Sequence, residues 1–253
     1  MSFLAAIRFL TVFPVIQRRE FSAEEVGRSS VWFSLIGLLL GGILVGVDSL
    51  LDGHLEEPVI NVLLIIAMAV MTGAFHLDGF GDTCDGMFLR RPAEERLRIM
   101  SDSRVGGFGV VGLCCLLLLK FAALGALPHD WRWIGLLVMP VVGRWTMVYL
   151  LFFFRYARES GKGVVFKKNV TWWRVALSTV IAAAIVAIAG GWGGVALMGA
   201  VGLIILLLAI YVNHGLKGLT GDTYGAANEM AEVLVLVLLP VIFRATHGGC
   251  LFD

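Results

Sequence analysis

Three aspartates lie close together in the segment from residue 76 to residue 86, which reads HLDGFGDTCDG. Asp78, Asp82 and Asp85 are spaced at i, i+4 and i+7, so on a helix that continued from the preceding apolar segment their carboxylates would share one face. Such like charges repel, and the repulsion costs more near a membrane, where carboxylates lose water. Oxygen ligands without an interleaved His or Cys pair favour Mg²⁺, which commonly binds carboxylates together with substrate phosphates. We therefore expect all three to be magnesium ligands.

A second polar segment, HGLKGLTGDTYGAANEMAE, covers residues 214 to 232. Asn228 and Glu232 are four residues apart with Glu229 between them, so several side-chain oxygens could point back toward Asp222. If the fold joins the two acidic segments, they could hold one or two Mg²⁺ ions against a diphosphate. We expect Asp222 and Glu229 to be further metal ligands and Asn228 to bind substrate.

Other polar residues border or enter the apolar segments. Asp102, Ser103 and Arg104 precede an apolar run, where Asp102 or Ser103 could equally bind substrate or cap the following helix. Arg104 could offset phosphate charge. Arg144 lies inside an apolar run and could form a structural ion pair. We favour the other interpretation, in which its side chain faces the acids and phosphates. Lys120 also lies within an apolar run, and its side chain could either snorkel to the membrane surface or pair with an acid.

A general base would be needed wherever a hydroxyl attacks a phosphate. His76 lies beside the carboxylates and could be a base, a ligand or a hydrogen-bond donor, while an aspartate such as Asp82 is the other choice for the base. Cys84 lies within the acidic segment, and we interpret it as a small packing residue. The chain has 4 cysteines and no CxxC pair, which indicates reduced thiols.

The composition places these residues in a membrane. Hydrophobic residues make up 58% of the 253 residues and charged residues 15%, whereas about a quarter of a soluble domain is charged. The mean hydropathy is +0.88. No basic tract interleaved with aromatic residues indicates nucleic-acid binding. The lipid bilayer is therefore the expected environment of the chain.

We expect an all-α, polytopic membrane bundle of about seven transmembrane helices, forming a single domain over residues 1–253. The runs are continuous and lack the alternation of barrel strands. A shorter N-terminal run, in which Phe3, Ile7 and Leu10 keep helical spacing before Pro14, predicts an interfacial helix. The predicted spans are Ser30–Leu51, Val59–Phe75, Val105–Leu127, Trp133–Phe154, Arg174–Ala189, Gly193–Asn213 and Ala226–Phe243.

The basic residues predict the orientation of this bundle. Sixteen of the 20 Lys and Arg residues fall in one set of alternate loops, and only Arg132 and Arg244 fall in the other. Since positive loops stay in the cytoplasm, the N-terminus and both acidic segments are expected there, with the C-terminus outside.

Several motifs together resemble one family. They are FHLDGFGDTCDG, MSDSRVG, VVGRW, YARESGKG, TGDTYGAANE and the opening FLTVFPV, and they extend from about residue 3 to residue 232. This combination is similar to that of cobalamin synthase, or adenosylcobinamide-GDP ribazoletransferase. The chain differs from the usual pattern at Phe80-Gly81, where Leu-Ala is commoner, at Val12, where a basic residue often occurs, and at Ile16, where proline is frequent. These differences concern substrate contacts.

The resemblance implies the last assembly step of vitamin B12. The family joins α-ribazole, or its 5′-phosphate, to adenosylcobinamide-GDP and releases GMP, using Mg²⁺. It further implies a bacterial or archaeal cytoplasmic membrane, and a homo-oligomer or a complex with other cobamide-assembly enzymes is possible. In this reaction the metal would act on the diphosphate, and Arg104 and Arg144 would offset phosphate charge.

Two other classes remain open at this stage. Other membrane transferases that act on diphosphates, UbiA-like or CDP-alcohol enzymes, also use aspartates and Mg²⁺. CDP-alcohol enzymes carry DGxxAR, which Asp78-Gly79 does not begin, and UbiA-like enzymes carry NxxxD pairs, whereas His76 precedes the first cluster. A divalent-cation transporter would need polar groups through the depth of the membrane, but here the acids lie at one edge.

Overall fold

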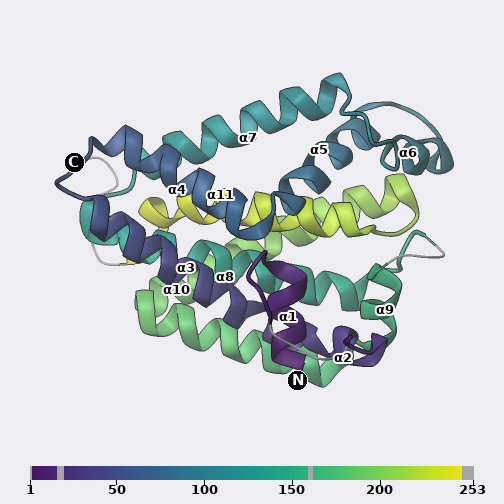
Figure 1. The fold of residues 1–253 in the computed structure, drawn as a ribbon, viewed down its shortest axis with the longest axis horizontal. Coiled ribbons are helices and arrows are strands. Elements are labelled where there is room, and N and C mark those ends of the chain that lie inside the picture. The colour runs from purple at the N-terminus through teal and green to yellow at the C-terminus, as the bar shows by residue number, and fades with distance from the viewer. Residues whose placement is uncertain (1, 16–19, 159–161, 247–253) are drawn as a thin grey trace.

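The computed structural model describes residues 2–15, 20–158 and 162–246 (Figure 1). The expected all-α class is confirmed, because the described residues form helices and no strand, with one isolated bridge between Tyr156 and Leu219. The helices are α1 Ser2–Leu10, α2 Ala23–Arg28, the 3-10 helix η1 Ser29–Trp32, α3 Phe33–Leu51, α4 Glu57–Thr72, α5 Phe75–Phe88, α6 Ala93–Ile99, α7 Gly107–Gly125, α8 His129–Phe153, α9 Lys162–Asn169, α10 Trp172–Leu216 and α11 Gly221–Thr246.

Within these residues, five helical segments are long and apolar enough to cross a membrane, and a sixth results if α4 and α5 are taken as one bent span. The polytopic membrane bundle is thus confirmed. Of the five, α10 has 45 residues and a non-helical backbone at Gly191. A Cβ on Gly194 would lie 2.2 Å from the carbonyl oxygen of Val186, although eight residues of straight helix span about 12 Å. The chain therefore folds back near Gly191, between the predicted fifth and sixth spans, and the total of seven stays a prediction.

The predicted second span, Val59–Phe75, does not continue into the acidic segment as one helix. Gly73 and Ala74 both have left-handed backbone angles, with φ of 62° and 55°, and they end α4 after Thr72. The following helix, α5, is bent by 93° from α4. The expectation of a continuous helix was wrong, because two successive left-handed residues stop the helical hydrogen bonding. Even so, the three aspartates share one helix, α5.

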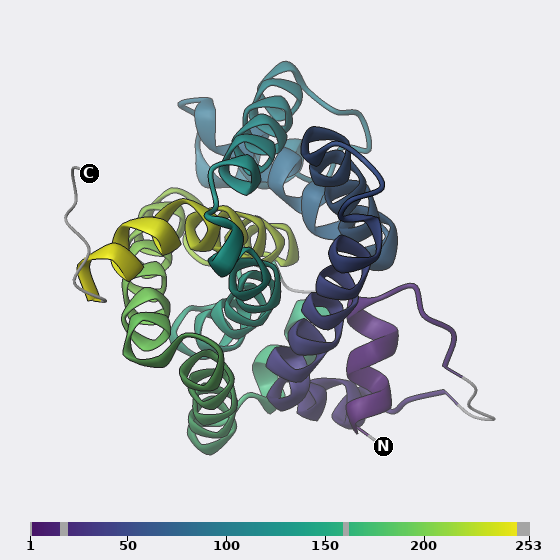
Figure 2. The ribbon, with the colours of Figure 1, turned by 90° about the vertical axis from the view of Figure 1, so that its left-hand side faces the viewer.

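The centre of the bundle is α8, which packs against α3, α10 and α11. A Cβ at Gly37 or Gly41 of α3 would lie 2.4 or 2.6 Å from a backbone oxygen of α8, so these glycines allow the two helices to approach closely. Figure 2 views the bundle from one end and shows α1 and α2 outside α3, on the side away from α11. Most of the helices around α8 are roughly parallel or antiparallel to one another, so the bundle has two distinct ends (Figure 1).

The two ends of the bundle are formed by different elements. The short helices α6 and α9 lie at one end, and the turn between α3 and α4 lies at the other (Figure 1). Basic residues are found in the last turns of both short helices, Arg96 and Arg98 in α6 and Lys167 and Lys168 in α9. We call this the basic end. The acidic helix α5 leads directly into it, through the loop before α6.

Candidate active site

The start of α11 packs directly against α5 and brings the two acidic segments together. A Cβ on Gly79 would lie 2.8 Å from the backbone oxygen of Asp222, so glycine is needed for this approach. One turn further along, a Cβ on Gly225 would lie 3.2 Å from the Cα of His76. The sequence expectation that the two segments meet is confirmed by this contact.

Three carboxylates gather at this contact, and we call them the mouth cluster: Asp78, Asp82 and Asp222. The Asp78 side chain is exposed, and those of Asp82 and Asp222 are partly buried. Asp82 lies within electrostatic range of three other carboxylates, those of Asp78, Asp222 and Asp85. Among the described side chains, the cation nearest to these acids is Arg158, whose Nη2 lies 2.9 Å from Oδ2 of Asp222. Within that part of the chain, the cluster carries more negative than positive charge.

Such an oxygen-rich, negatively charged group fits a hard divalent cation such as Mg²⁺. Among the residues that the structure describes, no three His, Cys, Asp or Glu side chains are arranged closely enough to form a complete metal site. Side-chain rotations and substrate oxygens would have to complete the coordination. The predicted magnesium role of these aspartates stays a prediction.

The third aspartate of α5, Asp85, points to α7. Its Oδ2 accepts a hydrogen bond from the amide of Gly106 and its Oδ1 one from the amide of Gly109, both at 2.8 Å. A Cβ at either glycine would come within 2.4 Å of the carboxylate. This buried carboxylate thus caps the N-terminus of α7, where free amides and the helix dipole favour an anion. Its predicted metal role is untested, and both of its oxygens already have partners.

Of the two alternatives for Asp102 and Ser103, the helix cap is contradicted, because α7 begins after Gly106 and its capping carboxylate comes from α5. Asp102, Ser103 and Arg104 lie in an exposed loop. Arg104 donates from Nε and Nη2 to the two oxygens of Asp102, at 3.1 and 2.8 Å. These hydrogen bonds lower the pKa of Asp102 to about 2. The substrate and catalytic roles predicted for the three residues remain untested.

A second group of charges, the interior network, lies deeper and joins α7, α8 and α11. Nζ of Lys120 lies 2.8 Å from Oε2 of Glu229 and 2.8 Å from Oε2 of Glu232. Arg144 pairs with Glu232, which also accepts a hydrogen bond of 3.1 Å from Nδ2 of Asn228. All five side chains are buried. Two cations face two anions, so the network is balanced in charge.

The interior network decides between alternatives that the sequence left open. Lys120 pairs rather than snorkels, and Arg144 forms the structural ion pair that was the less favoured interpretation. Nε and Nη2 of Arg144 have no hydrogen-bond partner among the described residues. The predicted metal role of Glu229 and the predicted substrate contacts of Arg144 and Asn228 are not tested by these contacts.

His76 is fully buried between α5 and α11, at the level between the two polar groups. Both ring nitrogens lack a hydrogen-bond partner in the described structure, and the ring lies 4.1 Å from that of Phe75, measured between centroids. In a neutral imidazole this leaves one donor and one acceptor without a partner. Its role as the general base stays a prediction.

A cavity of about 460 Å³ opens beside the mouth cluster, and we call it the aromatic cavity. It contains two of the acids, Asp78 and Asp222, together with Arg158. The described residues that line it are Phe9, Phe33, Phe75, Asp78, Met147, Leu151, Tyr156, Arg158, Gly163, Phe166, Gly221, Asp222 and Tyr224.

Arg158, Tyr156 and Tyr224 were not predicted to be site residues. Tyr224 belongs to α11, whereas Tyr156 and Arg158 lie in the segment after α8. This segment is tied to the turn before α11 by two backbone hydrogen bonds of 2.8 Å, one in each direction between residues 155–157 and Leu219. The YARESGKG motif was the available signal, because it holds Tyr156 and Arg158. No spacing rule connects that loop with Asp222, more than 60 residues later.

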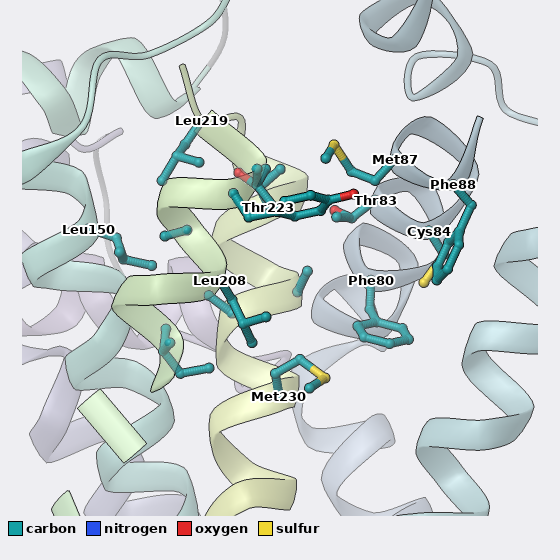
Figure 3. A pocket seen from close by; sticks show the side chains of 16 residues that line it. Phe80, Thr83, Cys84, Met87, Phe88, Leu150, Leu208, Leu219, Thr223 and Met230 are labelled. Atoms are coloured by element: carbon teal, nitrogen blue, oxygen red, sulfur yellow. The ribbon is translucent and has the colours of Figure 1, made fainter. Parts of the chain in front are cut away.

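A second cavity, of about 250 Å³, is lined by α5 on one side and by α10 and α11 on the other (Figure 3). Its described lining is almost wholly apolar and includes Phe80, Met87, Leu208 and Met230. It contains no charged side chain that could hold a phosphate. The aromatic cavity is therefore the better candidate for a charged substrate.

Comparisons with known proteins connect the chain with one family. A family described as Cobalamin-5-phosphate synthase matches residues 2–240. A protein named adenosylcobinamide-GDP ribazoletransferase from Geotalea daltonii is 38% identical over 245 residues, which cover 95% of this chain and 97% of the relative. Relatives of the same name from Roseiflexus sp. and Klebsiella pneumoniae are 39% and 37% identical, over 92% and 94% of this chain and 87% and 98% of their own. No solved structure matches the chain.

Proposed function

The chain belongs to the cobalamin-5-phosphate synthase family, and we propose that it joins α-ribazole, or its 5′-phosphate, to adenosylcobinamide-GDP with release of GMP in an Mg²⁺-dependent reaction. As a member of this family it is a membrane enzyme of cobalamin synthesis. The relatives' name contains both adenosylcobinamide-GDP and ribazole. We further propose that the basic end faces the cytoplasm, because positive loops are retained there.

The observation that supports this proposal is the mouth cluster, where α5 and α11 place Asp78, Asp82 and Asp222 beside a cavity that also holds Arg158. In the proposed reaction these three aspartates hold Mg²⁺, which when bound would offset charge on the diphosphate. We leave Asp85 and Glu229 out of this ligand set, because their oxygens are already engaged with the α7 amides and with Lys120.

The remaining steps belong to side chains of the chain itself. Arg158 offsets phosphate charge, and since it also pairs with Asp222, it can exchange that carboxylate for a phosphate when substrate arrives. The proton of the attacking ribose hydroxyl passes to an oxygen of Asp82 that the metal leaves free, or to His76, which lies on the same helix but is fully buried. The new bond joins the ribose oxygen to the phosphorus on the cobinamide side, and the bond to GMP breaks, so that GMP carries away the displaced charge.

The test is a reconstitution with the purified protein in detergent. Adenosylcobinamide-GDP and α-ribazole phosphate are supplied with Mg²⁺, and a parallel sample receives a chelator; GMP and the cobamide are then measured by chromatography. We expect both products in equal amounts and only with the metal. A well-folded protein that forms neither product would contradict the proposal.

A further inference from the structure

The inner wall of the aromatic cavity is built from phenylalanine rings of four separate elements. Phe9 of α1, Phe33 of α3, Phe75 of α5 and Phe166 of α9 all line it. The ring centroids of Phe9 and Phe166 are 4.6 Å apart, those of Phe33 and Phe166 are 5.6 Å apart, and those of Phe9 and Phe75 are 5.8 Å apart. Such packed rings offer flat faces and edges to a planar, apolar ligand.

One polar atom in this wall lacks a partner. The side chain of Tyr224 is only 3% exposed, and its hydroxyl has no hydrogen bond to any described residue. The ring of Tyr156 stacks beside it, with centroids 6.5 Å apart and an angle of 20° between the ring planes. A buried hydroxyl without a partner is costly, so it is usually satisfied by a ligand or by water.

The charges of the cavity lie on one side only. Asp78 and Asp222 belong to the mouth cluster, and Arg158 is paired with Asp222. Apart from these three residues, the described side chains of the lining offer the hydroxyls of Tyr156 and Tyr224 as polar groups. The cavity therefore fits a ligand with a planar apolar part, few hydrogen-bonding atoms and a polar part directed to the acids.

The bases of the two substrates differ in this respect. The edge of guanine presents several donors and acceptors, which would stay unsatisfied against phenylalanine rings. A benzimidazole nucleoside carries its ribose on one ring nitrogen and keeps the other nitrogen as its one acceptor. This single acceptor matches the Tyr224 hydroxyl, the one buried hydroxyl without a partner among the described residues that line the cavity.

We propose that the aromatic cavity binds the benzimidazole ring of α-ribazole, with the Tyr224 hydroxyl donating to the free ring nitrogen and the ribose directed to the mouth cluster. The assignment rests on the proposed function and adds to it the place of one substrate. It also leaves the guanosine of the other substrate outside this cavity.

The first test compares Tyr224→Phe with wild-type protein in the transferase assay. Because the variant loses one hydroxyl and keeps the ring, we expect KM for α-ribazole phosphate to rise about 5- to 10-fold, with KM for adenosylcobinamide-GDP unchanged. Tyr211→Phe is the matched control, since Tyr211 is 65% exposed on α10 and lies outside this cavity. A rise in KM for adenosylcobinamide-GDP instead would place guanosine in the cavity and overturn the assignment.

The second test uses the nucleoside of indole, in which a C–H group replaces the free ring nitrogen. Equilibrium dialysis measures its binding and that of α-ribazole to wild-type protein and to Tyr224→Phe. We expect wild-type protein to prefer α-ribazole about 5- to 10-fold and the variant to bind both nucleosides equally. An unchanged preference in the variant would show that Tyr224 does not contact the ring nitrogen.

These two measurements separate the assignment from the function on which it rests. If wild-type protein binds α-ribazole through Tyr224 but forms no product, the proposed reaction fails and the cavity assignment stands. If product forms but Tyr224→Phe changes neither binding nor KM, only the assignment fails. If Tyr224→Phe does not fold, Phe9→Leu replaces it, because Phe9 lines the same cavity and is only partly buried. The assignment would be overturned if this variant bound α-ribazole as tightly as wild-type protein does.

Discussion

The mouth cluster and the interior network are both made of charged side chains from neighbouring helices, and α11 contributes to each. The mouth cluster has three carboxylates that are exposed or partly buried, and one of them, Asp222, pairs with Arg158. In the interior network two cations face two carboxylates, all buried. An unbalanced, accessible cluster can bind a cation or a substrate, whereas a balanced, buried one mainly holds helices together. Charge balance and burial, more than residue type, thus distinguish the two regions.

The largest expected effect concerns the mouth cluster. In Asp82→Asn we expect transferase turnover to fall by about 1,000-fold or more, while the melting temperature in detergent stays near that of wild type. Asp52→Asn, an exposed aspartate in the turn after α3, is the matched control and should keep full turnover. Full turnover of Asp82→Asn at limiting Mg²⁺ would contradict the assignment of this carboxylate to the metal.

The interior network should respond in the opposite way. Lys120→Met leaves Glu229 and Glu232 buried with Arg144 as the one cation, and breaking a buried pair costs about 3–5 kcal/mol. Thermal unfolding in detergent should therefore show a large loss of stability, and the double variant Lys120→Met/Glu229→Gln should recover part of it. The control is Lys217→Met, at an exposed position. If Lys120→Met were as stable as wild-type protein, the structural role assigned to the interior network would be contradicted.

Asp85 distinguishes a helix cap from a metal ligand. As a cap, Asp85→Ala should lower the free energy of unfolding by about 1–2 kcal/mol, and Asp85→Asn, which keeps one acceptor, should lose less and retain turnover. A metal ligand would lose turnover in both variants with little change in stability. Parallel measurement of unfolding and turnover in the two variants decides between these roles.

The smallest expected effect is that of Arg158→Gln. Because this arginine both pairs with Asp222 and lies in the aromatic cavity, we expect kcat/KM to fall about 10-fold, the loss of one charge-assisted hydrogen bond. Arg155→Gln, three residues earlier and exposed, is the comparison and should keep wild-type kcat/KM. Equal kcat/KM in both variants would show that phosphate charge is not offset by Arg158.

Much of the fold could be predicted from the sequence, because the apolar runs in the sequence coincide with helices in the structure. The runs predicted around residues 105–127 and 133–154 correspond to α7 and α8 within a few residues. The bend between α4 and α5 was not predictable, because Ala74 adopts left-handed angles that its own side chain disfavours and that only the surrounding structure can impose.

The sequence placed the acids of α5 and α11 in one predicted site, but not the residues that pair with the acids. That Asp78 and Asp82 share one helix was predictable, because a helical repeat is a local property, whereas their metal role stays a prediction. Lys120 pairs with residues 109 and 112 positions away, a relation that helix packing sets and no local spacing reveals. The same reason applies to Asp85, whose partners on α7 lie 21 and 24 residues later in the chain.

The central claim is that the mouth cluster, and not the interior network, holds the divalent cation. Mn²⁺ can replace Mg²⁺ as a paramagnetic probe, and its binding can be followed by electron paramagnetic resonance in wild-type protein, Asp82→Asn and Glu229→Gln. We predict that Asp82→Asn loses the bound Mn²⁺ and that Glu229→Gln keeps it with unchanged affinity. Retention of the ion in Asp82→Asn together with its loss in Glu229→Gln would contradict the account.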